Sequence, residues 1–146
     1  MPDDRITAVQ RRAVFERAQY RCEYCRTPEA CVSDPFAVEH IIPRSKGGKT
    51  RLNNLACACT ACNGHKHKAI AAVDPFSRQL VPLFHPRKQR WAGHFSWSED
   101  GLRMVGLTPT GRATVKTLQM NHPKMIKLRQ LLLLAGAHPL NEQELN

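Results

Sequence analysis

The spacing of apolar residues predicts a helix, a hairpin and a second helix in the first half of the chain. Apolar positions recur at helical intervals from residue 7 to residue 20, and no Gly or Pro interrupts them. Residues 36–42 are rich in β-branched and apolar types, which favours a short strand, and a second strand is expected at 55–58. A helical pattern then runs from Thr60, which can serve as N-cap, to about Ala72.

The second half begins with an extended, Pro-containing connector and then becomes periodic again. Residues 95–97 and 102–105 flank a Gly-containing turn, which predicts a hairpin. Two helices are expected after it, at 109–120 with Thr108 as N-cap and at 123–135 with Asn121 as N-cap. The fold class is therefore expected to be α+β.

The predicted elements divide the chain into a core and an extension. Residues 1–72 would form the core, with its N-terminal helix, hairpin and second helix. Residues 73–146 would form an extension of connector, hairpin and two helices that packs on the core.

Charge points to a polyanionic partner. The chain has 22 Lys and Arg against 12 Asp and Glu, a formal net charge of +10. Such a field attracts nucleic acid, although a solvated basic surface without a partner is the alternative. The longest apolar run, residues 131–135, is far shorter than a membrane span, and no secretory leader is recognisable. We therefore expect a cytoplasmic protein that does not associate with membranes.

The cysteines form two C-x-x-C pairs, Cys22 with Cys25 and Cys59 with Cys62. Each pair can offer two thiolates to one tetrahedral ion, and four thiolates leave no open coordination position. The pattern predicts a structural zinc that staples the core, with a redox role for one pair as the alternative. The segment between the pairs, 26–58, is long enough to hold a complete hairpin.

The most informative motifs lie between and just after these pairs. In chain order they are Val38-Glu39-His40-Ile41-Ile42-Pro43, Gly47-Gly48, Asn53-Asn54-Leu55 and Cys59-Thr60-Ala61-Cys62-Asn63. From Cys22 to about Lys68, roughly a third of the chain, this order and spacing resemble the HNH endonuclease family. The resemblance implies a ββα-metal fold, in which a hairpin and a helix hold one divalent ion.

The same resemblance implies a metal-dependent endonuclease that hydrolyses DNA and leaves a 5′-phosphate. His40 would be the general base, and Asn54 would orient its ring. Glu39 and Asn63 would bind a catalytic Mg²⁺ or Mn²⁺, with His67 as a further candidate ligand. Asn63 stands where many members have His, which makes this the H-N-N version of the motif. These roles agree with chemistry, since a neutral imidazole can accept a proton from water and hard cations prefer oxygen ligands.

Basic residues surround the proposed metal site and are expected to bind the phosphates of double-stranded DNA. They are Arg44, Lys46, Lys49, Arg51, Lys66 and Lys68. Two other functions remain open at this point. One is a catalytically inactive, zinc-dependent nucleic-acid-binding module, and the other is a structural zinc domain that binds proteins through the leucine-rich helix at 123–135. The oligomeric state is also open.

Overall fold

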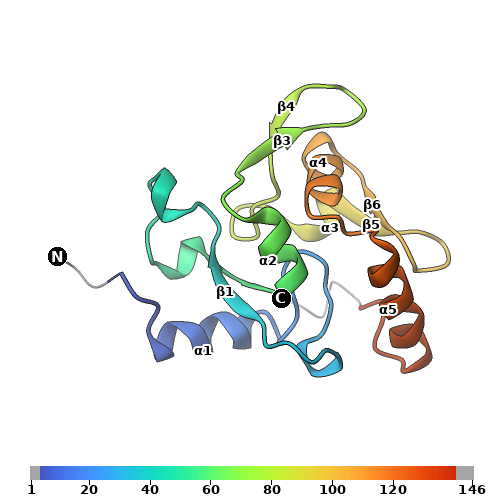
Figure 1. Ribbon diagram of the computed structural model, residues 1–146, viewed down its shortest axis with the longest axis horizontal. Coiled ribbons are helices and arrows are strands. Elements are labelled where there is room, and N and C mark those ends of the chain that lie inside the picture. Colours follow the sequence, from blue (N-terminus) through green and yellow to red (C-terminus); the bar gives the residue numbers. More distant parts are fainter. Residues whose placement is uncertain (1–3, 141–146) are drawn as a thin grey trace. The chain divides into compact units, whose positions relative to one another are not determined.

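The structure, a computed structural model, describes residues 4–140 and divides into two compact units (Figure 1). The first contains the residues up to Ile70 together with His85–Lys88. The second contains Ala71–Phe84 together with the residues from Gln89 onward. Both combine short helices with two-stranded antiparallel sheets, which confirms the α+β class.

The first unit is built on a helix, a hairpin and a second helix. These elements are α1 (Ala8–Arg17), the antiparallel strands β1 (Ala37–His40) and β2 (Leu55–Ala58), and α2 (Thr60–Lys66). In the hairpin His40 pairs with Leu55, so the catalytic-motif end of β1 lies beside the start of β2. Helix α1 packs on the hairpin, and α2 packs against β1. All four residues of β2 are buried, which makes this strand the centre of the unit's core.

Local chemistry explains where α1 begins and ends. Thr7 caps its N-terminus, and Thr7 and Gln10 exchange side-chain-to-backbone hydrogen bonds in a capping box. The helix ends at Arg17 rather than near residue 20, because Gln19 and Tyr20 adopt positive φ angles of 53° and 56° that no α-helix contains.

Helix α2 is shorter than expected, and its cap differs. The side chain of Cys59, not Thr60, accepts the capping hydrogen bond, from the backbone of Cys62. The helix ends at Lys66 because His67 has a φ of 48°. Ala72, expected at the end of this helix, instead pairs with Val81 in the second unit.

The loop between the two strands of the first unit folds back tightly on itself. It includes two single-turn 3₁₀ helices, Arg44–Lys46 and Leu52–Asn54. Gly47 has a φ of 91°, and a Cβ on Gly48 would lie 1.7 Å from the carbonyl oxygen of Ile42. No other residue type fits at position 48 without moving the backbone, because real Cβ atoms do not approach an oxygen so closely.

A separate segment, His85–Lys88, completes the first unit. Arg87 forms an ion pair there with Glu23, whose side chain is buried. Burial lowers the pKa of Arg87 to about 10. The other carboxylate oxygen of Glu23 accepts a hydrogen bond of 2.8 Å from the backbone of Cys57.

The second unit contains two hairpins and three helices among its described residues. They are β3 (Ala71–Val73) with β4 (Leu80–Pro82), α3 (Trp91–His94), β5 (Phe95–Trp97) with β6 (Met104–Gly106), α4 (Pro109–Thr117) and α5 (Pro123–Leu134). The β5–β6 hairpin and both long helices were expected. The β3–β4 hairpin was not, since the sequence there reads as an extended connector.

Packing and capping in the second unit follow ordinary rules. Trp91 is buried and its ring contacts those of Phe95 and Trp97. Thr108 caps α4 as expected, whereas the N-cap of α5 is His122 and not Asn121. The side chain of Asn121 instead bonds the backbone of Met104 at both its N–H and its carbonyl, which removes it from the capping position. No helix in the part of the chain described here is long and apolar enough to cross a membrane.

Candidate functional site

The four cysteines of the two C-x-x-C pairs come together as expected. Cys22, Cys25, Cys59 and Cys62 are all buried, and their sulfur atoms lie within 4.8 Å of one another. In each pair the backbone N–H of the second cysteine points at the sulfur of the first, at 3.5 Å for Cys25 and 3.4 Å for Cys62.

This arrangement fits a structural zinc ion. Four sulfur ligands match tetrahedral zinc. Burial raises the pKa of Cys22, which disfavours its thiolate unless a cation is bound. The two remaining cysteines lie outside the cluster. Cys31 is exposed, and Cys57 is buried in β2, where burial raises its pKa to about 12.

A second feature of the first unit is an open cleft of about 480 Å³ beside the hairpin and α2. Its lining consists of two motif residues from the end of β1, three from the loop that follows and three from α2 and just beyond. They are Glu39, His40, Pro43, Arg44, Ser45, Asn63, His67 and Lys68. The cleft thus brings together the expected base and all three candidate ligands of the catalytic ion.

The ring of His40 is held by Thr50. Its Nε2 lies 2.8 Å from the hydroxyl oxygen of Thr50, and that hydroxyl donates its proton to the carbonyl of Asp4 at 2.9 Å. Thr50 therefore accepts from His40, which places the imidazole proton on Nε2 and leaves the lone pair on Nδ1. Partial burial, and secondarily the charge of Arg44, lower the pKa of His40, which favours the neutral ring.

The carboxylate of Glu39 is buried and held by two partners. The hydroxyl of Tyr24 donates to one oxygen, and the ammonium of Lys66 lies 3.3 Å from the other. Burial raises the pKa of Glu39, while these two partners oppose that shift. A carboxylate has about four lone-pair positions, so two of them remain for a cation in the cleft.

Lys66 corrects one expectation. The sequence suggested an exposed residue that contacts DNA phosphates, but its side chain is 2 % exposed. Its ammonium also donates to the carbonyl of Ile41 at 2.8 Å. Lys66 therefore joins α2 to the end of β1 from inside the unit and cannot reach a phosphate on the surface.

Asn54 also acts differently from expectation. Its side chain accepts a hydrogen bond from the N–H of Ile42 and donates to the carbonyls of Ile42 and Lys49. It thus closes the loop around Gly48 by backbone contacts, while Thr50 contacts the His40 ring. The contacts of the Asn54 side chain fix the backbone just after His40.

The remaining basic candidates lie on the surface. They are Arg44, Lys46, Lys49, Arg51 and Lys68. Arg44 is partly engaged by exposed Asp4 at 2.8 Å, and Lys46 donates to the carbonyl of Lys68 at 2.8 Å. The second contact joins the loop after β1 to the segment after α2. Of the five residues, Arg44 and Lys68 line the cleft.

The candidate ligand within α2 and the one just after it differ in their surroundings. Asn63 is half-buried within the helix, and its backbone carbonyl accepts a hydrogen bond from the backbone N–H of His67. His67 is exposed and follows the helix end. A carboxylate oxygen of Glu39 and the side-chain amide oxygen of Asn63 are ligand types that suit Mg²⁺ or Mn²⁺.

Sequence reasoning did not identify Thr50 and Tyr24. They are 10 and 15 residues from the side chains they contact, and hydroxyl residues at such distances carry no recognisable spacing. Only the folded loop shows that Thr50 reaches His40 and that Tyr24, inside the first C-x-x-C pair, reaches Glu39.

Comparison with known families agrees with these observations. Residues 22–69 match the model of the HNH endonuclease family, which covers about a third of the chain. The matched segment contains both C-x-x-C pairs, β1, β2 and α2. No match was found among curated proteins or among solved structures. The chain therefore contains an HNH domain, which indicates a nuclease-type function.

Proposed function

We infer that this HNH-domain protein is an endonuclease that hydrolyses phosphodiester bonds of double-stranded DNA. The observation that carries the proposal is the shared cleft, which is lined by His40, Glu39 and Asn63 together with the basic residues Arg44 and Lys68. A general base, oxygen donors for a cation and positive charge for a polyanion are the three requirements of metal-dependent phosphodiester hydrolysis.

His40 supplies the base. With its proton on Nε2 and held by Thr50, Nδ1 is free to accept a proton from a water molecule in the cleft. The water oxygen forms a bond to phosphorus, the bond from phosphorus to the 3′ oxygen breaks, and the 3′ oxygen takes up a proton from solvent. The products are a 5′-phosphate and a 3′-hydroxyl.

Glu39 and Asn63 are the proposed ligands of the catalytic divalent ion, with His67 as a further candidate. When bound, such an ion supplies positive charge that stabilises the phosphate and the leaving oxygen. Tyr24 and Lys66 hold the Glu39 carboxylate in place, so its free lone pairs are oriented before a cation arrives.

DNA binding rests on phosphate contacts from exposed basic residues, of which Arg44 and Lys68 line the cleft. Such contacts position the duplex without reading its sequence. We therefore expect little sequence preference from Arg44, Lys46, Lys49, Arg51 and Lys68.

Conversion of supercoiled plasmid to open-circular and linear forms, in Mg²⁺ or Mn²⁺, tests the proposal. His40→Ala should lower the rate by roughly 10²- to 10⁴-fold, which is the usual contribution of a general base. Its zinc content and its affinity for duplex DNA should stay normal. The matched control is His65→Ala, which removes an exposed histidine of α2 outside the cleft and should leave the rate unchanged.

Metal binding provides an independent readout of the ligand roles. Titration with Mn²⁺ followed by electron paramagnetic resonance should show weaker binding for Asn63→Ala and near-normal binding for His40→Ala. High metal concentration should then restore part of the activity of Asn63→Ala but none of that of His40→Ala. If His40→Ala cuts plasmid at the wild-type rate after contaminating nuclease is excluded, His40 is not the base and the proposed mechanism is wrong. Plasmid left intact by the wild type would favour the nucleic-acid-binding module.

A further inference from the structure

A rigid turn in the second unit holds an aromatic ring in solvent. Strands β3 and β4 pair with Val73 opposite Leu80, and residues 74–79 connect them. Phe76 lies in this turn with 82 % of its surface exposed. Burial of a Phe side chain is favourable, so its exposure leaves that free energy for a partner to recover.

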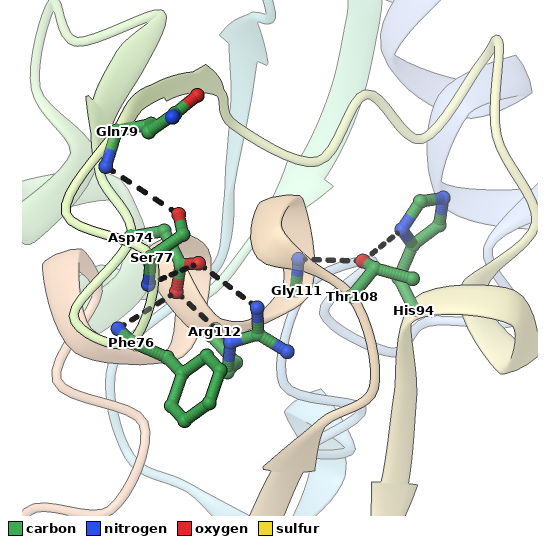
Figure 2. A network of polar contacts seen from close by, with 8 residues as sticks. All are labelled: Asp74, Phe76, Ser77, Gln79, His94, Thr108, Gly111 and Arg112. Carbon is green, nitrogen blue, oxygen red and sulfur yellow. Dashed lines mark hydrogen bonds and ion pairs between the residues drawn. The ribbon is translucent and has the colours of Figure 1, made fainter.

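The turn is organised around Asp74, whose side chain is fully buried (Figure 2). Its two carboxylate oxygens accept hydrogen bonds from the backbone of Phe76 at 3.2 Å and of Ser77 at 3.1 Å. Its own backbone exchanges hydrogen bonds of 2.9 Å with Arg78 and Gln79. The backbone that carries Phe76 is therefore fixed on both sides, so the turn itself has little conformational entropy to lose on binding.

Arg112 of α4 joins the turn to the body of the unit. Its guanidinium donates two parallel hydrogen bonds of 2.9 Å to Asp74, and its central carbon lies 5.3 Å from the centre of the Phe76 ring. Figure 2 shows Arg112 beside the ring, with Asp74 above both. Helix α4 is anchored in turn by Thr108, which accepts from the backbone of Gly111 at 3.0 Å.

We propose that this turn is a base-stacking site, in which Phe76 stacks on an unpaired base of the DNA substrate. The proposal rests on the proposed function for the identity of the nucleic acid and narrows its substrate to duplex DNA that contains unpaired or unstacked bases. In intact duplex both faces of a base are covered by its neighbours, so a protein ring gains access only where stacking is open.

Charge favours a nucleobase over an apolar protein surface. Asp74 is the one acidic residue of segment 71–84, and Arg112 neutralises it. Exposed Arg78 adds a positive charge to the same turn. An aromatic face beside cations suits a ligand that has flat bases joined by phosphates.

The test compares two labelled oligonucleotides with the same number of phosphates. One is oligodeoxythymidylate, and the other carries abasic sites throughout. Affinity is measured by fluorescence anisotropy with the full chain in zinc-containing buffer without Mg²⁺ or Mn²⁺, so that cleavage does not contribute. Wild type should bind the oligomer with bases at least about fivefold more tightly, since stacking contributes about 1–3 kcal/mol per base.

Substitutions at Phe76 separate stacking from other contacts. Phe76→Ala should remove the difference between the two oligomers, and Phe76→Leu should also remove most of it, because a Leu side chain is apolar but has no π face. Phe76→Trp should retain it. The control is Lys46→Ala combined with Lys49→Ala, which should weaken binding of both oligomers equally and lower the salt dependence.

Four results would overturn the proposal. Three concern the oligomers: equal affinity of wild type for both, an unchanged preference in Phe76→Ala, and full preference in Phe76→Leu. An effect of Phe76→Ala confined to anionic phosphatidylglycerol vesicles would also overturn it, in favour of a lipid partner. Failure of the proposed function is separate, because it appears as equal plasmid cleavage by His40→Ala and wild type, whatever the oligomers show.

Discussion

The buried pair of Lys66 and Glu39 allows a quantitative test of how the first unit holds its proposed metal ligand. Lys66→Met keeps the unbranched apolar stem of the side chain but removes its ammonium. Glu39 then loses its only described cationic partner, and the carbonyl of Ile41 loses a hydrogen bond of 2.8 Å. Tyr24 remains as the one described donor to the carboxylate.

The expected loss is large because both groups are shielded from water. The side chains of Lys66 and Glu39 are 2 % and 4 % exposed, so solvent cannot replace the missing ammonium. Removal of one partner of a buried ion pair costs about 3–5 kcal/mol. This is a substantial fraction of the roughly 5–15 kcal/mol by which a domain is usually stable.

A double-mutant cycle with Glu39→Gln isolates the interaction between the two side chains. In the double variant no uncompensated charge is buried, so it should be more stable than Lys66→Met alone. The coupling free energy should be at least about 1 kcal/mol, within the range found for contacting residues. Release of zinc during urea denaturation reports on this unit, whereas tryptophan fluorescence reports on the other, because Trp91 and Trp97 both belong to the second unit.

The outcome can refute the reasoning directly. A coupling free energy near zero would mean that Lys66 does not stabilise the Glu39 carboxylate. A shift of the tryptophan transition as large as that of zinc release would mean that the two units do not unfold separately, so the loss could not be assigned to this pair.

Three further predictions concern the zinc cluster, the loop and the second unit. Cys25→Ser should lose zinc and much of the folded structure, since zinc binding contributes on the order of 10 kcal/mol in small modules, whereas Cys31→Ser should behave as wild type in zinc content and circular dichroism. Gly48→Ala should lower the melting temperature through its backbone clash, while Gly64→Ala, in a helix with open space around it, should raise it slightly; melting curves that coincide would contradict this. Asp74→Asn should destabilise the second unit at neutral pH, because Arg112 holds the pKa of Asp74 well below its ordinary 3.8. The difference in unfolding free energy between wild type and Asp74→Asn, measured in urea by tryptophan fluorescence, should be constant above pH 3.8. It should shrink as the pH falls below 3.8.

The chemistry that depends on short-range spacing could be predicted from the sequence. Each C-x-x-C pair places two thiols on one turn by its spacing alone. Only the tertiary structure brings the two pairs together. The adjacent Glu39 and His40, and Asn63 directly after the second pair, likewise identified the cleft that the structure contains. The α+β class followed from periodicity, which reflects how strands and helices bury one face.

Tertiary structure alone decided how these residues are held. Lys66 resembles any basic residue of a helix, and its burial follows from the packing of α2 against β1, which brings a carboxylate and a carbonyl within its reach. Thr50 reaches His40 only because Gly48 and Asn54 let the loop fold back.

The turn around Asp74 could not be predicted from the sequence for the same physical reason. Its carboxylate is satisfied by Arg112, which is 38 residues away in sequence, and no local pattern reports a contact at that distance. Residue types and short spacings therefore determined which chemistry this chain can carry. The burial, pairing and orientation of those groups depend on long-range contacts, and these exist only once the chain has folded.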